Sequence, residues 1–171
     1  MTTLVPMISQ EEIAQKVKET GQQISLDYEN KELILIGILK GSFIFLADLT
    51  RLISIDHKVD LVGVSSYSGT STTGIIKFTK EPDLELKGKD ILIVEDIVDT
   101  GRTLSALLKF FKTYEPSSMK VCTLIDKSER RDVPVEVDYA CFHLDEGFIV
   151  GYGLDYDQKY RNLPAIFDLK L

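Results

Sequence analysis

Short aliphatic runs alternate along the chain with segments whose apolar residues recur at helical spacing. Several of these runs contain almost no polar residue, which is typical of central strands that are covered on both faces of a sheet. Strands are therefore predicted at 33–39, 59–65, 75–78, 91–94 and 121–125, with short strands within 136–150, of which 148–150 is the last that we expect.

Helical patterns lie between these strands. The first, 9–26, has one apolar stripe and begins with Ser9 and Glu12, which fit a capping box. A second helix is predicted at 43–49, and a third begins at Leu104. Strands that alternate with helices predict an α/β fold with a mainly parallel central sheet flanked by helices. We expect one domain that spans 1–171.

Composition and charge narrow the class of protein. The length of 171 residues and a hydrophobic content of 44% fit one globular domain with a substantial core. The net charge of −7 argues against general nucleic-acid binding, which needs a basic surface. There is neither a long apolar run nor a signal-peptide pattern, so we expect no membrane association and a cytoplasmic location. Cys122 and Cys141 are expected to be buried free thiols.

The stretch from 91 to 104 contains most of the candidate chemistry. The strand predicted at 91–94 is followed at once by the carboxylates Glu95 and Asp96. A polar turn at 99–103 then leads into the helix that begins at Leu104. Amides and hydroxyls between a strand and a helix N-terminus are typical of phosphate sites in open α/β sheets. A simple helix cap would need only one of these polar residues.

Three further loops offer weaker signals. Lys40 and Gly41 follow the first strand and could hold a second anion, although by themselves they are better explained by a tight turn with a solvent-facing lysine. Lys127 ends the strand at 121–125, either at the same sheet edge or as a surface residue. The polar, glycine-bounded stretch 65–74 is interpreted as a lid, with an exposed hairpin connection as the alternative. There is no P-loop and no nucleophile elbow.

The segment from Val94 to Thr103 closely resembles the phosphoribosyl-pyrophosphate motif of type I phosphoribosyltransferases. Further segments resemble the hypoxanthine (hypoxanthine-guanine) phosphoribosyltransferases, and they occur in family order across nearly the whole chain. These segments are Leu39 to Ser42, Ser66 and Tyr67, Lys127, 148–156, and Arg161.

The resemblance implies transfer of a phosphoribosyl group from 5-phosphoribosyl-1-pyrophosphate to hypoxanthine, and to guanine as well. It implies Mg²⁺ as the cofactor, with Glu95, Asp96 and Asp155 as the metal-binding residues. Glu95 and Asp96 would also lie beside the ribose hydroxyls. The 5′-phosphate would be held by Asp99, Thr100, Gly101, Arg102 and Thr103.

The same resemblance assigns the remaining roles. Asp99 would be the general base, and Lys127 would donate to the 6-oxo group of a purine stacked on Phe148, with Ile149 and Asp155 beside the base. The pyrophosphate would be bound by Lys40, Gly41 and Arg161, with a cis peptide bond between Lys40 and Gly41; Ser66 and Tyr67 would belong to the lid.

At the level of the fold, the resemblance implies a type I phosphoribosyltransferase fold with a small hood subdomain over the active site. The N-terminal residues and roughly 127–171 would form this hood. It also implies a homodimer or homotetramer. Guanine-only, xanthine and pyrimidine transferases remain alternatives within the superfamily. A non-catalytic regulator that binds nucleic acid is opposed by the acidic charge, and a phospho-acceptor domain would not explain the polar turn at 99–103.

Overall fold

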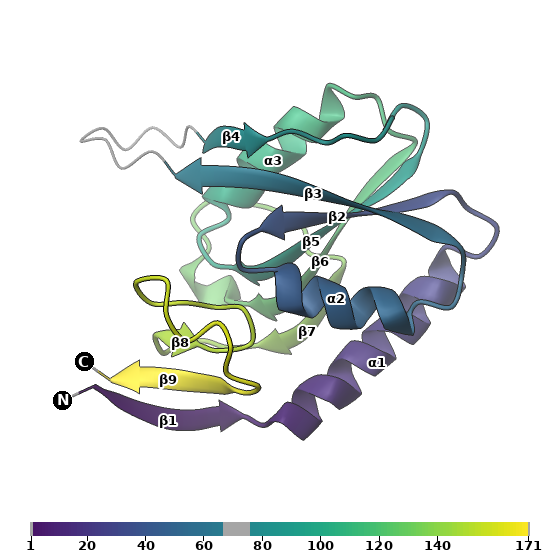
Figure 1. Ribbon diagram of the computed structural model, residues 1–171. Helices are drawn as coiled ribbons and strands as arrows, with labels where there is room; N and C mark the ends of the chain where they lie inside the picture. The colour runs from purple at the N-terminus through teal and green to yellow at the C-terminus, as the bar shows by residue number, and fades with distance from the viewer. Residues whose placement is uncertain (1, 67–75, 171) are drawn as a thin grey trace.

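A six-stranded sheet forms the centre of the molecule (Figure 1). The computed structural model describes residues 2–66 and 76–170. The strand order is β4-β3-β2-β5-β6-β7, and every neighbouring pair is parallel except β3 and β4. This confirms the predicted α/β fold with a mainly parallel sheet. The strands are β2 (Leu33–Leu39), β3 (His57–Ser66), β4 (Ile76–Lys80), β5 (Asp90–Val98), β6 (Ser118–Asp126) and β7 (Tyr139–His143).

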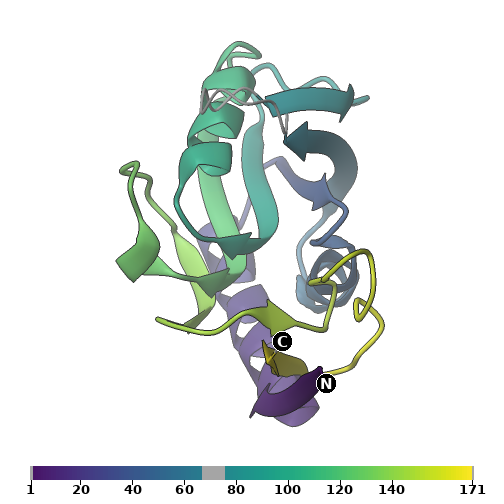
Figure 2. The same cartoon turned by 90° about the vertical axis from the view of Figure 1, so that its left-hand side faces the viewer.

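Helices cover both faces of this sheet, as Figures 1 and 2 show. They are α1 (Gln10–Asp27), α2 (Phe43–Leu52) and α3 (Arg102–Lys112), and a short 3-10 turn, η1, spans Ser128–Arg130. In β2, Leu33 and Leu35 join the core beneath α1 and α2, whereas Ile34 and Ile36 join the core beneath α3. Burial on both faces explains why this strand has no polar alternation. Among the described residues, no helix is long and apolar enough to cross a membrane.

The start of α1 confirms the predicted capping box. The amide of Glu12 donates to the Ser9 hydroxyl at 3.2 Å, and the Ser9 amide donates to the Glu12 carboxylate at 2.8 Å. Such a cap contributes about 1 kcal/mol to helix stability. It fixes where the helix begins, so that the apolar stripe of α1 faces the sheet.

A second, three-stranded sheet joins the two ends of the chain. Its order is β1-β9-β8, with β1 at Thr3–Ile8, β8 at Ile149–Val150 and β9 at Ile166–Lys170. The prediction that 148–150 is the last strand is therefore wrong. Neither β1 nor β9 has a strong local signal: β1 is mostly exposed and contains Pro6, and each depends on pairing with the far end of the chain. The predicted hood would include this sheet.

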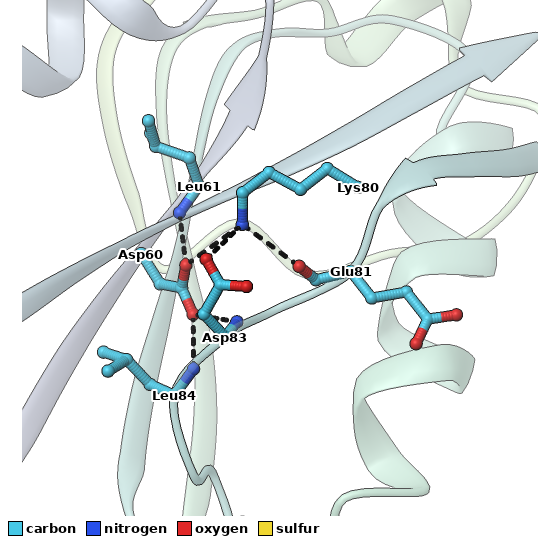
Figure 3. Close-up of polar contacts among 6 residues, drawn as sticks. All are labelled: Asp60, Leu61, Lys80, Glu81, Asp83 and Leu84. Atoms are coloured by element: carbon cyan, nitrogen blue, oxygen red, sulfur yellow. Dashed lines mark hydrogen bonds and ion pairs between the residues drawn. The ribbon is translucent and has the colours of Figure 1, made fainter.

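The outer edge of the large sheet is held by a buried carboxylate, shown in Figure 3. Asp60, in β3, accepts hydrogen bonds from the amides of Leu61, Asp83 and Leu84 at 2.8 to 2.9 Å. The Lys80 ammonium lies 3.7 Å from the same carboxylate, at the end of β4 that is remote from residue 76. The network ties the connection between β4 and β5 to the sheet.

Candidate active site

Two adjoining cavities lie at the C-terminal ends of the parallel strands. The first has a volume of about 280 Å³ and lies between the ends of β2 and β5 and the start of α3. Its polar lining comes from residues that the sequence singled out: Glu95, Asp96, Asp99, Thr100, Gly101 and Thr103, with Gly41 across from them.

The second cavity has a volume of about 260 Å³ and lies beside the small sheet. It shares Asp96, Ile97 and Asp99 with the first cavity, so the two are compartments of one site. The other residues that line it are Lys127, Arg130, Gly147, Phe148, Ile149, Leu154 and Asp155. The fold thus brings the predicted purine residues next to the predicted ribose-phosphate residues.

The two acidic residues of the first cavity belong to the strand itself. The aliphatic run ends at Val94, but β5 continues to Val98, so Glu95 and Asp96 are held on a rigid strand rather than on a loop. Burial and then the neighbouring Asp96 carboxylate raise the pKa of Glu95 well above its usual range. Burial raises the pKa of Asp96 to about 6, although the Ile97 amide and Arg161 oppose that shift. The site therefore favours a cation beside these groups.

Three segments meet tightly around Asp96. A Cβ atom at Gly41 would overlap the Asp96 carboxylate, and one at Gly153 would overlap the Gly41 carbonyl oxygen. Only glycines allow this approach, so both loops pack directly onto β5. The predicted position of the cis peptide bond is wrong by one residue, because the cis bond joins Leu39 to Lys40. Neither bond precedes a proline, so the residues carry no local signal for either position.

The two cations predicted to bind pyrophosphate point to one place. The Lys40 ammonium and the Arg161 guanidinium each donate to the side-chain oxygen of Gln158, at 3.2 Å in both cases. Arg161 also donates to the Gly153 carbonyl at 2.6 Å and pairs with Asp155 at 2.7 Å. Two cations that converge on a single oxygen form a suitable site for an anion.

The predicted phosphate loop, residues 99–103, turns at Gly101, which has a φ of +85° and precedes the first residue of α3. The side chains of Thr100 and Thr103 line the first cavity, together with the backbone at the helix N-terminus. The Arg102 side chain is directed elsewhere, because its guanidinium pairs with Asp132 at 2.6 Å. The Arg102 amide donates to the Thr100 hydroxyl oxygen at 3.4 Å, and Arg102 is not among the residues that line the first cavity.

Lys127 is buried at the end of β6, not exposed in a charged loop. Its ammonium donates to the Gly147 carbonyl at 2.6 Å. Burial lowers its pKa, and the nearby Asp99 opposes that shift. Phe148 is half exposed and contacts Tyr156 edge to face, with 5.5 Å between ring centroids, while Ile149 is buried. This compartment combines one buried donor with an aromatic face.

Asp99 lies where the two compartments join. One of its carboxylate oxygens is buried and has no hydrogen-bond partner within the described parts of the chain. The other oxygen is 3.4 Å from the Arg130 guanidinium. Arg130 is not predicted from the sequence, because it resembles one more charge in a polar loop. Its only signal was its position three residues after Lys127.

The predicted lid is largely outside the described residues. Ser66 is the last residue of β3, where its backbone pairs with Ile76, and Tyr67 is not among the residues described. The role of this segment stays a prediction.

No group of three metal-ligating side chains occurs within residues 2–66 and 76–170. Asp96 and Asp155 nevertheless line the same cavity, and Asp96 and Glu95 line the other. Mg²⁺ is commonly held by one or two carboxylates together with substrate phosphates. The carboxylates present fit a metal ion that binds together with a phosphorylated substrate.

Comparisons with known proteins agree with this geometry. A model of the phosphoribosyl transferase domain matches residues 7–157. The hypoxanthine phosphoribosyltransferase of Escherichia coli is 46% identical over 167 residues, which cover 96% of this chain and 94% of that protein. A hypoxanthine-guanine phosphoribosyltransferase of Streptococcus thermophilus is 47% identical over 165 residues, covering 96% of this chain and 92% of its own.

A solved structure extends the agreement to the whole fold. A crystal structure of a hypoxanthine-guanine phosphoribosyltransferase from Bacillus anthracis matches with a TM-score of 0.94 and 43% identity, covering all of both chains. The fold and the resemblance predicted from the sequence are thereby confirmed. The chain belongs to the hypoxanthine (hypoxanthine-guanine) phosphoribosyltransferases, within the phosphoribosyl transferase family.

Proposed function

We propose that this protein is a purine-salvage enzyme that transfers the 5-phosphoribosyl group from 5-phosphoribosyl-1-pyrophosphate to hypoxanthine, and also to guanine. The products are the purine 5′-monophosphate and pyrophosphate. The observation that carries the proposal is the pair of adjoining cavities that share Asp96 and Asp99. One compartment has the lining of a sugar-phosphate site, and the other has a buried lysine beside an aromatic ring.

In the first compartment, the 5′-phosphate would bind to the loop formed by residues 99–103. Thr100 and Thr103 would contribute hydroxyls, while Gly101 and Arg102 would contribute amides at the start of α3. Glu95 and Asp96 would lie beside the ribose hydroxyls. Ionised beside a bound cation, these carboxylates would favour the positive character that develops on the ribose as pyrophosphate leaves.

In the reaction, a ring nitrogen of the purine forms a bond to the anomeric carbon while the bond to pyrophosphate breaks. The proton of that nitrogen would pass to the Asp99 carboxylate, which acts as general base. The proposal is supported by the position of Asp99 at the junction of the two compartments, where one of its carboxylate oxygens has no hydrogen-bond partner among residues 2–66 and 76–170.

Selection of 6-oxopurines would rest on Lys127. An ammonium group has three donors and no acceptor, so it can keep its bond to Gly147 and still donate to a 6-oxo oxygen. An adenine amino group would present a second donor and would be rejected. Phe148 would stack on the base, and Ile149 and Asp155 would lie along its edge.

Pyrophosphate would be bound by Lys40, Gly41 and Arg161. The side chains of Lys40 and Arg161 support this, since both donate to the same oxygen atom of Gln158. The family uses Mg²⁺, which Asp96, Asp155 and Glu95 would hold. When bound, the metal ion would neutralise the charge of the leaving pyrophosphate. A lid that includes Ser66 and Tyr67 would exclude water from the activated ribose.

Further parts of the proposal concern organisation. The small sheet and residues 127–171 would form a hood over the site. We propose a homodimer or homotetramer, located in the cytoplasm, that binds neither membranes nor nucleic acid.

A panel of acceptors tests the proposed function. The protein is mixed with 5-phosphoribosyl-1-pyrophosphate and Mg²⁺, and nucleotide formation is measured with hypoxanthine, guanine, xanthine, adenine and uracil in turn. We expect turnover with hypoxanthine and guanine, and none with adenine or uracil. Turnover of adenine or uracil in preference to hypoxanthine would contradict the assignment.

A further inference from the structure

Arg131 makes several polar contacts beside the phosphate loop, and its side chain is only 15% exposed. Its guanidinium donates to the carbonyl oxygens of Asp99 at 3.1 Å and Val135 at 3.2 Å, with a longer contact of 3.5 Å to Val98. It also pairs with the Asp126 carboxylate. These bonds use the planar fork of five donors that is specific to arginine.

The residues that follow Arg131 also contact the phosphate loop, through their backbone. The amides of Asp132 and Val133 both donate to the Thr100 carbonyl, each at 3.1 Å. Gly101 packs against the same segment, where an added Cβ would be 2.6 Å from the Val133 carbonyl oxygen. The outer side of the loop is thus held by backbone bonds, while its inner side lines the first cavity.

The same segment begins at the residue proposed to select the purine. The Lys127 amide donates to the carbonyl of Val98, the last residue of β5, at 2.9 Å, so the chain between 127 and 133 is bonded to the end of β5 at one end and to the phosphate loop at the other. Arg131 lies between these ends and binds the backbone of Asp99. One segment therefore fixes the positions of the purine-binding lysine and the phosphate loop relative to each other.

We infer that Arg131 is a positioning residue, which holds the backbone of Asp99 so that its carboxylate and the phosphate loop keep the geometry needed for transfer. The inference rests on the proposed function for the identity of the reaction. The orientation of the Asp99 side chain depends on its backbone, because one oxygen has no hydrogen-bond partner within the described residues and the other pairs with Arg130, whose side chain is exposed. A displacement of about 1 Å in such a group can lower the rate about 100-fold.

The test compares Arg131→Lys and Arg131→Met with a matched control. Lysine keeps the charge and the Asp126 ion pair but cannot reach three carbonyl oxygens from a planar fork. Asp60→Asn is the control, because it also breaks buried bonds between a side chain and backbone but lies at the outer sheet edge (Figure 3). The measurements are melting temperature, kcat and KM for hypoxanthine and 5-phosphoribosyl-1-pyrophosphate, and the affinity for ribose 5-phosphate by calorimetry.

Both Arg131 variants are expected to lower kcat/KM about 100-fold and to weaken ribose 5-phosphate binding. Asp60→Asn should lower the melting temperature by a comparable amount. It should change kcat/KM and the affinity for ribose 5-phosphate by no more than about twofold, because Asp60 lies at the outer sheet edge rather than in the site. Activity of Arg131→Lys within about twofold of wild type would overturn the inference, as would failure of both Arg131 variants to fold. If the wild-type protein does not convert hypoxanthine, the proposed function is wrong, and ribose 5-phosphate binding still tests the role of Arg131 separately.

Discussion

Two carboxylates on the same sheet, Asp96 and Asp60, should respond in opposite directions when each is changed to an amide. Asp96 is an acid whose ionised form is unfavourable, because burial raises its pKa from the ordinary 3.8 to about 6. Asp60, by contrast, accepts three backbone hydrogen bonds and lies near Lys80. We therefore predict that Asp96→Asn stabilises the metal-free protein at pH 7.5 and that Asp60→Asn destabilises it.

The magnitude follows from the pKa of Asp96. A folded-state pKa above the unfolded one means that the folded state binds the proton more tightly, so stability is lost as pH rises from about 4 to about 6. A difference of about two pKa units corresponds to about 3 kcal/mol, and partial solvent access reduces this to about 2 kcal/mol. In Asp60→Asn, an NH2 group replaces one of the carboxylate oxygens that accept backbone hydrogen bonds. This should lower the free energy of unfolding by about 1–3 kcal/mol.

Urea unfolding of the metal-free proteins between pH 4.5 and pH 7.5 measures both effects. The stability advantage of Asp96→Asn should be largest above pH 6 and should shrink as the pH falls towards 4, because the folded wild type then binds the proton. Its transferase activity should be lost at the same time. The reasoning would be refuted if Asp96→Asn were less stable than the wild type at pH 7.5, or if its advantage did not change with pH.

Three further substitutions test individual contacts. Asp99→Asn should lower kcat about 100-fold or more with little change in the affinity for ribose 5-phosphate, and near-normal kcat in steady-state assays would remove Asp99 as the base. Lys127→Ala should reduce the preference for hypoxanthine over adenine about tenfold or more in competition assays, whereas unchanged discrimination would exclude its selective role. Gly153→Ala should raise the KM for pyrophosphate in the reverse reaction, because the new Cβ would overlap the Gly41 carbonyl; Gly88→Ala, at a φ of +70° in open space, is the control and should leave that KM unchanged.

Much of the central sheet could be predicted from the sequence, because its signals are local. The aliphatic run of β2 faces two cores, and the capping box at Ser9 marks where α1 begins. The small sheet could not be predicted in the same way. Its strands β1 and β9 come from opposite ends of the chain and pair Thr3 with Lys170, so neither is recognisable before the other is placed.

The candidate site shows the same division. The polar turn at 99–103 is contiguous, and its pattern indicates a phosphate site by itself. From the sequence, Lys127 could lie at the sheet edge beside the site or on the surface. Only its contact with Gly147 in the folded chain shows that it is buried. The sequence does not mark Arg131 as important. Its partners are backbone carbonyl oxygens, which every residue type has, so no sequence pattern indicates them.

The central claim is that this fold joins a purine to a ribose phosphate. Its most direct test is a time course with hypoxanthine, 5-phosphoribosyl-1-pyrophosphate and Mg²⁺, in which inosine 5′-monophosphate and pyrophosphate are both quantified. We expect the wild-type protein to form the two products in equal amounts. We expect Asp99→Asn to form them at most very slowly. Pyrophosphate release without the nucleotide, or no product at all, would contradict the central claim.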